Sequence, residues 1–381
     1  MQIPFNRTYL TGKEKKYIED VLEKRKLSGE GYYTKKVTSL LENKFSLDKV
    51  FMTSSGTHAL EMAVELIELQ EGDEVIMPSF TFPSTANAVI NQGARPVFAE
   101  VKENTFNIDP ADIEKKITEK TKAVIPVHYA GVGCEMDKVL YLAEKHQLYI
   151  IEDAAQGVNA SYKNKYLGGI GNFGCYSFHG SKNYVSGEGG ALILNNCSNT
   201  IKGRAEIIRQ QGTNKACFLR GEVEEYSWVD RGSSYLPSDI LMAVLYAQLE
   251  DMDKIKVMRK KIYKRYYNNL KYFLNRSFLD SISCIPENRD ANYHIFYLKF
   301  NNRKIRDFVL NSLKSKGISA VFHYIPLHSS PMGKKLGYKA EDLEITEQIS
   351  ATILRLPLYP ELTDEQLTYI LNNIVDVFEE L

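Results

Sequence analysis

Few cysteines, a balanced charge and the lack of a long apolar run limit what this chain can be. The five cysteines are odd in number, are scattered and form no CxxC pair, which disfavours disulfides or structural zinc and fits a reducing cytoplasm. Lys+Arg and Asp+Glu number 48 each, so we expect no nucleic-acid partner. No stretch approaches about 18 uninterrupted apolar residues, and the first residues lack a signal-peptide core, so we expect no membrane segment.

What the chain does have is the composition and length of a globular protein with more than one core. Hydrophobic residues make up 44% and charged residues 25% of its 381 residues. A chain of this length exceeds one ordinary core, so two domains are predicted. We place the large domain at residues 1–245 and a smaller C-terminal domain at 246–381.

Short apolar runs that predict strands alternate with helical patterns over about 150 residues. The strands are expected at 50–53, 74–78, 96–100, 123–128 and 148–153. Such alternation predicts a mostly parallel, doubly wound sheet, whose ligands gather at the carboxyl ends of the strands. Ser54–Thr57, Phe82, His128 and Asp153 all fall at such ends.

The rest of the chain predicts a compact α+β unit after a long helical stretch at 238–272. Its expected elements are a strand at 292–300, a helix at 302–316, a strand at 318–326 and a closing helix at 362–380. Near the start, two helices at 12–26 and after residue 31 flank the glycine-containing stretch 27–31. This stretch is either a plain helix connection or a rim over a binding site.

One stretch organises the chain: residues 174–184, which contain Lys182 after an aromatic-rich strand and before the glycine cluster 187–190. A lysine amine forms a Schiff base with a carbonyl compound, pyridoxal 5′-phosphate (PLP) among them, when its neutral form is accessible. Taken alone, a lysine is most often a solvated surface charge. The interpretation therefore depends on the other groups that PLP requires.

PLP requires an acid for its pyridine nitrogen, a flat partner for its ring and a phosphate cradle. Asp153 ends a strand and is followed by two alanines and Gln156, an amide for the phenolic oxygen. Phe82 is a candidate ring partner, and Ser177 is a hydroxyl near the phosphate. The strand-to-helix turn 55–57 exposes unpaired N–H groups suited to that phosphate. Singly, each feature is more often a helix cap or a core residue.

In this order the motifs are specific, and the whole chain resembles the sugar-nucleotide aminotransferases of the fold-type-I, aspartate-aminotransferase-like PLP enzymes. The resemblance implies an α/β fold with a mostly parallel central sheet flanked by helices, plus a smaller α+β C-terminal domain. It makes Lys182 the catalytic lysine that binds PLP covalently. It implies these further cofactor-binding residues: Ser55, Gly56, Thr57, Phe82, Asp153, Gln156, Ser177 and Ser234. The candidate substrate-binding residues are His179, Tyr184, His323 and Tyr324.

Three stretches, 126–131, 228–235 and 322–328, are most similar to family members that aminate the C4 ketone of dTDP-4-keto-6-deoxy-D-glucose. The resemblance thus implies L-glutamate as donor, dTDP-4-amino-4,6-dideoxy-D-galactose as product and a role in lipopolysaccharide O-antigen biosynthesis. It also implies a cytoplasmic homodimer with shared active sites. Many members have Asn-Tyr-Arg where this chain has 234–236, Ser-Tyr-Leu. Ser234 would then make a shorter contact with the partner's PLP phosphate or leave it to water.

Other functions stay open at this point. The same scaffold supports amination of a 3-keto sugar, or formation of a gluco-configured 4-amino product. A PLP-dependent 3-dehydratase is disfavoured, because those enzymes resemble this family but have histidine where this chain has Lys182. A PLP-binding regulator without turnover is disfavoured by the complete set of Lys182, Asp153 and Gln156. A nucleotide-binding α/β protein without PLP would be colourless.

Overall fold

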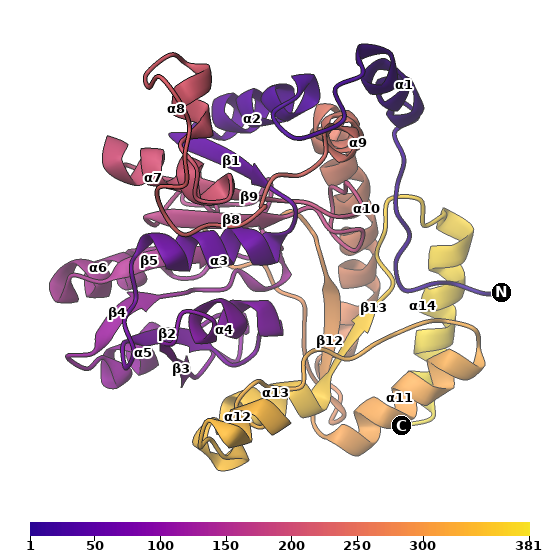
Figure 1. Ribbon diagram of the computed structural model, residues 1–381. Helices are drawn as coiled ribbons and strands as arrows, with labels where there is room; N and C mark the ends of the chain where they lie inside the picture. The colour runs from indigo at the N-terminus through magenta and orange to yellow at the C-terminus, as the bar shows by residue number, and fades with distance from the viewer.

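A seven-stranded sheet forms the centre of the larger part of the molecule (Figure 1). The computed structural model describes all of residues 1–381. In spatial order the strands are β1 (Lys49–Thr53), β9 (Gly190–Leu194), β8 (Phe173–Ser177), β5 (Tyr149–Asp153), β4 (Thr121–Val124), β2 (Glu74–Pro78) and β3 (Arg95–Ala99). Only β9 runs antiparallel to its neighbours, β1 and β8. The mostly parallel sheet predicted from the sequence is confirmed.

Helices cover both faces of this sheet, because its strands have apolar side chains on both faces. Alternate residues of β1 show the division: Val50 and Met52 belong to one buried cluster, and Phe51 belongs to the other. The first cluster includes residues of α2 (Tyr32–Phe45), α5 (Pro110–Lys116), α6 (Met136–His146) and α9 (Asp239–Glu250). The second includes residues of α3 (Gly56–Leu66), α4 (Pro83–Ile90) and α7 (Asn199–Arg209).

A second, three-stranded antiparallel sheet belongs to the C-terminal part of the chain. Its order is β10 (Leu279–Ile282), β12 (Phe296–Phe300) and β13 (Ile353–Leu356). Three helices contribute to its own apolar cluster: α10 (Met252–Leu270), α11 (Arg303–Ser315) and α14 (Asp364–Glu379). The two-domain division at 245/246 stays a prediction, and that position lies within α9.

The remaining elements are short or peripheral. They are α1 (Glu14–Lys24), α8 (Lys215–Leu219), α12 (Pro331–Lys335), α13 (Glu344–Thr352), β6 (Ser161–Tyr162), β7 (Lys165–Tyr166) and β11 (Arg289–Asp290). None of the helices has a stretch long and apolar enough to cross a bilayer.

The strand expected at 318–326 is wrong. This segment makes only isolated bridges, from Ile318 to Ile3 and from Val321 to Arg355. Pro326 lacks the N–H group that a continuing ladder would need. The segment instead runs irregularly to the cavity described below, and it brings His323 and Tyr324 there.

The glycine-containing stretch 27–31 connects α1 to α2 and packs on the start of α9. A Cβ on Gly31 would lie 2.3 Å from Cγ of Asp239, so only glycine fits. The Asp239 carboxylate accepts the backbone N–H groups of Tyr33 and Thr34 at 3.1 and 2.7 Å, and thereby caps α2. This contact fixes the connection against the larger domain.

Candidate active site

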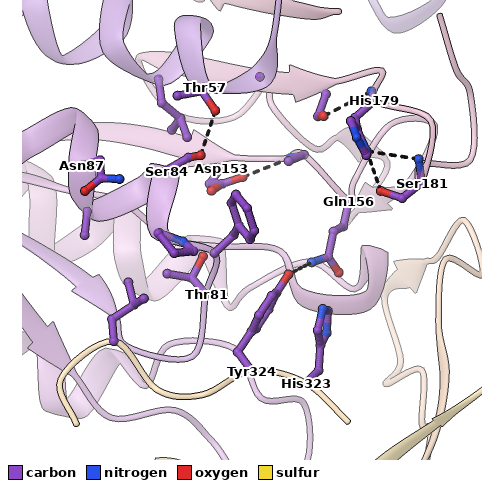
Figure 2. A pocket seen from close by; sticks show the side chains of 18 of the residues that line it. Thr57, Thr81, Ser84, Asn87, Asp153, Gln156, His179, Ser181, His323 and Tyr324 are labelled. Carbon is purple, nitrogen blue, oxygen red and sulfur yellow. Dashed lines mark hydrogen bonds between the residues drawn. The ribbon is translucent and has the colours of Figure 1, made fainter. Parts of the chain in front are cut away.

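A cavity of about 940 Å³ lies beyond the carboxyl ends of the parallel strands (Figure 2). The larger sheet and its helices line one side, through residues such as Thr57, Phe82 and Asp153. The C-terminal part closes the other side with the segment 323–336 and with Arg355 of β13. The position agrees with the general rule for ligand sites in open α/β sheets.

The turn between β1 and α3 forms an anion cradle at one end of this cavity. The Ser55 side chain caps α3 by accepting the His58 N–H at 3.1 Å. The N–H groups of Gly56 and Thr57 have no partner within the helix and carry its positive dipole end. A Cβ on Gly56 would lie 2.8 Å from Cβ of Ser177, so the turn admits only glycine there.

Two hydroxyl groups join the backbone groups of this cradle. Thr57 Oγ1 lies 2.7 Å from Ser84 Oγ at the start of α4, and Ser177 ends β8 directly below Gly56. Both Thr57 and Ser177 line the cavity. Backbone N–H groups at a helix N-terminus together with hydroxyls suit a phosphate.

Asp153, the last residue of β5, lies in the cavity floor with only 6% of its surface exposed. Its Oδ2 accepts a hydrogen bond from Thr85 Oγ1 at 2.8 Å, and its Oδ1 accepts the Ala155 N–H at 3.2 Å. These two donors fix the carboxylate in place. It can therefore hold a protonated ring nitrogen.

Lys182 follows β8 and reaches the same cavity. Its amine makes no hydrogen bond or ion pair with another residue. Burial lowers the pKa of Lys182, the nearby Arg355 charge lowers it further, and Asp153 opposes both effects. A lysine of lowered pKa offers a neutral amine for attack on a carbonyl carbon or for proton transfer.

The wall opposite the cradle is a hydrogen-bonded aromatic group (Figure 2). Gln156 Oε1 accepts the Ala130 N–H at 2.8 Å, and Gln156 Nε2 donates to Tyr324 Oη at 3.1 Å. The His323 ring stacks on Tyr324 with centroids 3.5 Å apart, and its Nδ1 lies 3.2 Å from Tyr129 Oη. Burial and the Arg355 charge hold the pKa of His323 below its usual range, so this imidazole is neutral.

Phe82 stands immediately before α4, lines this cavity and is 60% exposed. An exposed aromatic ring inside a concave site provides a face for another flat ring. At the rim, His179 is about half exposed, and its Nδ1 accepts the Ser181 N–H at 3.2 Å. Both residues line the cavity, and their roles toward cofactor and substrate stay predictions.

Tyr184 does not reach the cavity, and its predicted contact with substrate is not supported. It is 1% exposed, and its hydroxyl donates to the Met252 carbonyl at 3.2 Å and accepts from Asn159 Nδ2. A phenol in this position fills the core and satisfies its own polar atom. Ser234 is exposed, accepts from Gln211 Nε2 at 3.1 Å and lies outside its own chain's cavity. Its contact with a partner subunit stays a prediction.

His128 also turns away from the cavity, although it follows a strand end. It is fully buried, its Nδ1 accepts the Cys134 N–H at 3.1 Å, and its Nε2 lies 2.8 Å from Glu152 Oε2. Glu152 in turn accepts the N–H groups of Gly168, Ile170 and Gly171. The pair ties the β5 end to the loop before β8 and so supports Asp153.

Arg355 and His294 also line the cavity, and neither was predicted from the sequence. The signal for Arg355 was present, because one arginine interrupts the apolar strand β13. His294 precedes β12, and its Nδ1 lies 2.8 Å from Asn183 Oδ1. Burial and neighbouring positive charges, Lys182 first among them, lower its pKa. Both residues come from the C-terminal part.

Together these residues fit PLP. The glycine-only turn at Gly56 leaves room for a phosphate, and Asp153 and Phe82 suit the ring nitrogen and the ring face. Lys182 supplies an unpaired amine for the aldehyde carbon. The fold and the site thus define a PLP-dependent enzyme of fold type I.

The chain belongs to the DegT/DnrJ/EryC1/StrS aminotransferase family, whose model matches residues 8–375. It is 32% identical to GDP-perosamine synthase of Escherichia coli O157:H7 over 389 residues, which cover 99% of both chains. It is 33% identical over 333 residues to the spore coat polysaccharide biosynthesis protein SpsC of Bacillus subtilis (strain 168), covering 85% of this chain and 84% of SpsC.

Among solved structures, the sugar-aminotransferase fold of Spr1654 from Streptococcus pneumoniae superposes with a TM-score of 0.92 at 26% identity, covering 100% of this chain and 98% of that one. Spr1654 has been solved in PMP and PLP forms. The protein is accordingly a PLP-dependent sugar aminotransferase. The nucleotide sugar on which it acts is a separate question.

Proposed function

We propose that the protein transfers the amino group of L-glutamate to the C4 ketone of dTDP-4-keto-6-deoxy-D-glucose, forming dTDP-4-amino-4,6-dideoxy-D-galactose. The observation that carries the proposal is the unpaired Lys182 amine inside a cavity of about 940 Å³. That volume is near the upper end of ligand sites, which run to about 1,000 Å³, and leaves space for a second ligand beside a cofactor. The choice of sugar rests on three stretches, 126–131, 228–235 and 322–328. They are similar to family members that aminate the C4 ketone of dTDP-4-keto-6-deoxy-D-glucose.

PLP, when bound, carries the amino group between donor and acceptor and withdraws electrons from the carbon that gains or loses a proton. Its phosphate would be held by Ser55, Gly56, Thr57 and Ser177. Its ring nitrogen would be held by Asp153. These assignments follow from the hydrogen-bonding groups that each residue offers.

Lys182 performs the proton transfers in this proposal. Its amine removes a proton from the α-carbon of glutamate, and later delivers one to C4 of the sugar. Since it lies on one side of the site, delivery from that side alone determines the configuration at C4. His179, His323 and Tyr324 are proposed to contact the sugar. The neutral His323 can accept or donate a hydrogen bond without repelling Lys182.

A GDP-linked keto sugar is the second candidate. The relative from Escherichia coli O157:H7 that matches 99% of this chain is named for GDP-perosamine. The difference between the two candidates concerns the base and the sugar, whereas the chemistry at Lys182 is the same. A direct comparison of substrates therefore separates them.

The test incubates the PLP-loaded enzyme and glutamate with dTDP-4-keto-6-deoxyglucose or with a GDP-linked 4-keto-6-deoxy sugar. The amino sugar is then assigned by NMR. We expect the dTDP substrate to be turned over with the higher kcat/KM and to give an axial C4 amine. An equatorial amine, amination of a 3-keto isomer alone, or preference for the GDP sugar would refute this proposal.

We further propose that the enzyme is a cytoplasmic homodimer that serves lipopolysaccharide O-antigen biosynthesis. Support for the dimer comes from the exposed stretch around Ser234, in which Trp228 is 78% exposed. A large exposed aromatic residue is typical of a surface that another chain covers. The polysaccharide role is supported by the relative SpsC, named for spore coat polysaccharide biosynthesis.

A further inference from the structure

His294 is a cavity residue to which the roles proposed above assign nothing. It lies just before β12 and reaches the cavity of Lys182 from the C-terminal part of the chain. The preceding residue, Tyr293, has a left-handed φ of 57°, which is uncommon for an aromatic residue. Arg259 holds this turn, because it donates to the Tyr293 and His294 carbonyls at 3.0 and 2.8 Å. A strained backbone that its surroundings hold in place is typical of a functional position.

The contacts of Asn183 determine which nitrogen of the His294 ring carries a proton. Asn183 Nδ2 donates to the Asn292 carbonyl at 2.9 Å, so the amide oxygen is the atom that faces His294. This Oδ1 lies 2.8 Å from Nδ1 of His294. An amide oxygen only accepts hydrogen bonds, so Nδ1 carries the proton of the neutral ring and Nε2 carries the lone pair. Nε2 has no hydrogen-bond partner within the protein, and His294 therefore has an unused acceptor.

The charged groups around this ring keep it neutral. Burial comes first in lowering the pKa of His294, and the charge of Lys182 comes next. Arg259 of α10, Arg355 of β13 and the nearby His323 lower this pKa further. A buried imidazole among positive charges does not take up a second proton at neutral pH. The lone pair of Nε2 therefore stays available.

Lys182 is a hydrogen-bond donor that lacks an acceptor. No hydrogen bond contributes to its pKa, on which Asp153 of β5 and Arg355 of β13 act through their charges alone. Lys182 and His294 line the main cavity together, and both also line an adjoining cavity of about 10 Å³. A space of this size holds about one water molecule. The unused donor and the unused acceptor thus border the same small space.

We infer that His294 is a positioning residue for Lys182: its Nε2 accepts a hydrogen bond from the protonated amine across this small cavity. The inference rests on the proposed role of Lys182 in proton transfer. An amine that has taken a proton from carbon is an ammonium, and a buried ammonium without an acceptor is costly. The proton stays on Nζ throughout, and His294 only accepts the hydrogen bond. His294 thereby stabilises the proton-carrying form of Lys182 and fixes the side from which the proton is returned.

The test measures the pKa of the Lys182 amine in enzyme loaded with pyridoxamine 5′-phosphate, in which this amine is not bonded to the cofactor. Acetic anhydride modifies only the neutral amine, so acetylation of Lys182 against pH, read by peptide mass spectrometry, gives the pKa. His294→Phe keeps a flat ring but removes the acceptor. It should lower the pKa of Lys182 by about 1 to 2, the effect of one hydrogen bond to a charged group.

Two further variants separate the hydrogen bond from packing. His294→Gln restores an acceptor and should return the pKa of Lys182 most of the way to the wild-type value. His146→Phe makes the same substitution at the exposed end of α6 and should leave that pKa unchanged. If His294→Phe does not fold, ¹⁵N NMR of the histidine-labelled wild type, assigned with His294→Gln, takes its place. We expect the proton of the His294 ring on Nδ1.

Three results would each overturn the inference. They are an equal pKa of Lys182 in wild type and His294→Phe, an equal fall in His294→Phe and His294→Gln, and a ring proton on Nε2 of His294. None of these measurements involves the sugar. If the wild type aminates no tested sugar but the pKa of Lys182 falls as expected, the proposed substrate fails and this inference stands.

Discussion

Replacement of Lys182 by alanine is the most direct test of the site. The substitution removes the only unpaired amine in the cavity floor and adds neither bulk nor charge. The Ser55–Thr57 turn, Phe82 and Asp153 do not depend on it for any hydrogen bond. We therefore expect Lys182→Ala to fold and to bind PLP without a covalent bond.

The loss of activity is expected to be large. Removal of a general acid–base group costs typically about 10²–10⁴-fold, which corresponds to roughly 3–5 kcal/mol of activation free energy. Loss of the covalent attachment adds to this cost. Lys182→Arg keeps a positively charged side chain of similar length, but its guanidinium cannot deliver a proton. We therefore expect this variant to be as inactive as Lys182→Ala.

Stability provides an independent readout in the cofactor-free protein. Burial lowers the pKa of Lys182 below its ordinary 10.5, so the unfolded chain binds this proton more readily than the folded one. The free energy of unfolding of the wild type should therefore rise with pH between the lowered pKa and about 10.5. Lys182→Ala lacks this penalty, so its stability advantage should shrink over the same range.

The assay is borohydride reduction of the PLP-loaded wild type, followed by peptide mass mapping and by single-turnover kinetics with glutamate on both variants. Reduction should leave the pyridoxyl group on Lys182 and on no other lysine. A label elsewhere, or Lys182→Ala activity within tenfold of wild type, would refute the assignment and the proton-transfer role built on it. A pH-independent difference in stability would contradict the buried amine.

Two further predictions concern the cradle and the assembly. Gly56→Ala places a Cβ 2.8 Å from that of Ser177, and we expect PLP affinity measured by titration to fall about tenfold, the cost of one displaced phosphate hydrogen bond. Gly203→Ala, a helical glycine with nothing within 4 Å, should leave PLP affinity unchanged, and equal affinities in both variants would argue against the cradle. Light scattering should give about twice the chain mass of 43.4 kDa, and an active monomer would disprove the shared site at Ser234.

Much of the site was predictable because it depends on local patterns at strand ends. Asp153 ends one apolar run. The Ser-Gly-Thr turn directly follows another apolar run and opens a helix. In a parallel sheet such ends meet at one edge, so a linear pattern predicts a spatial group. The same reasoning placed His128 at a strand end but did not show that it turns away from the cavity, because periodicity does not reveal its buried partner, Glu152.

By itself, the sequence determined the alternation of strands and helices, hence the parallel sheet, and the positions of Lys182 and Asp153 along it. These follow from hydrophobic periodicity, which acts over a few residues. Only the tertiary structure decided that Tyr184 is a core residue and that Arg355 is a cavity cation without an ion-pair partner. The reason is physical: burial and charge at a side chain depend on segments distant in the chain, and no local pattern encodes which of them will meet.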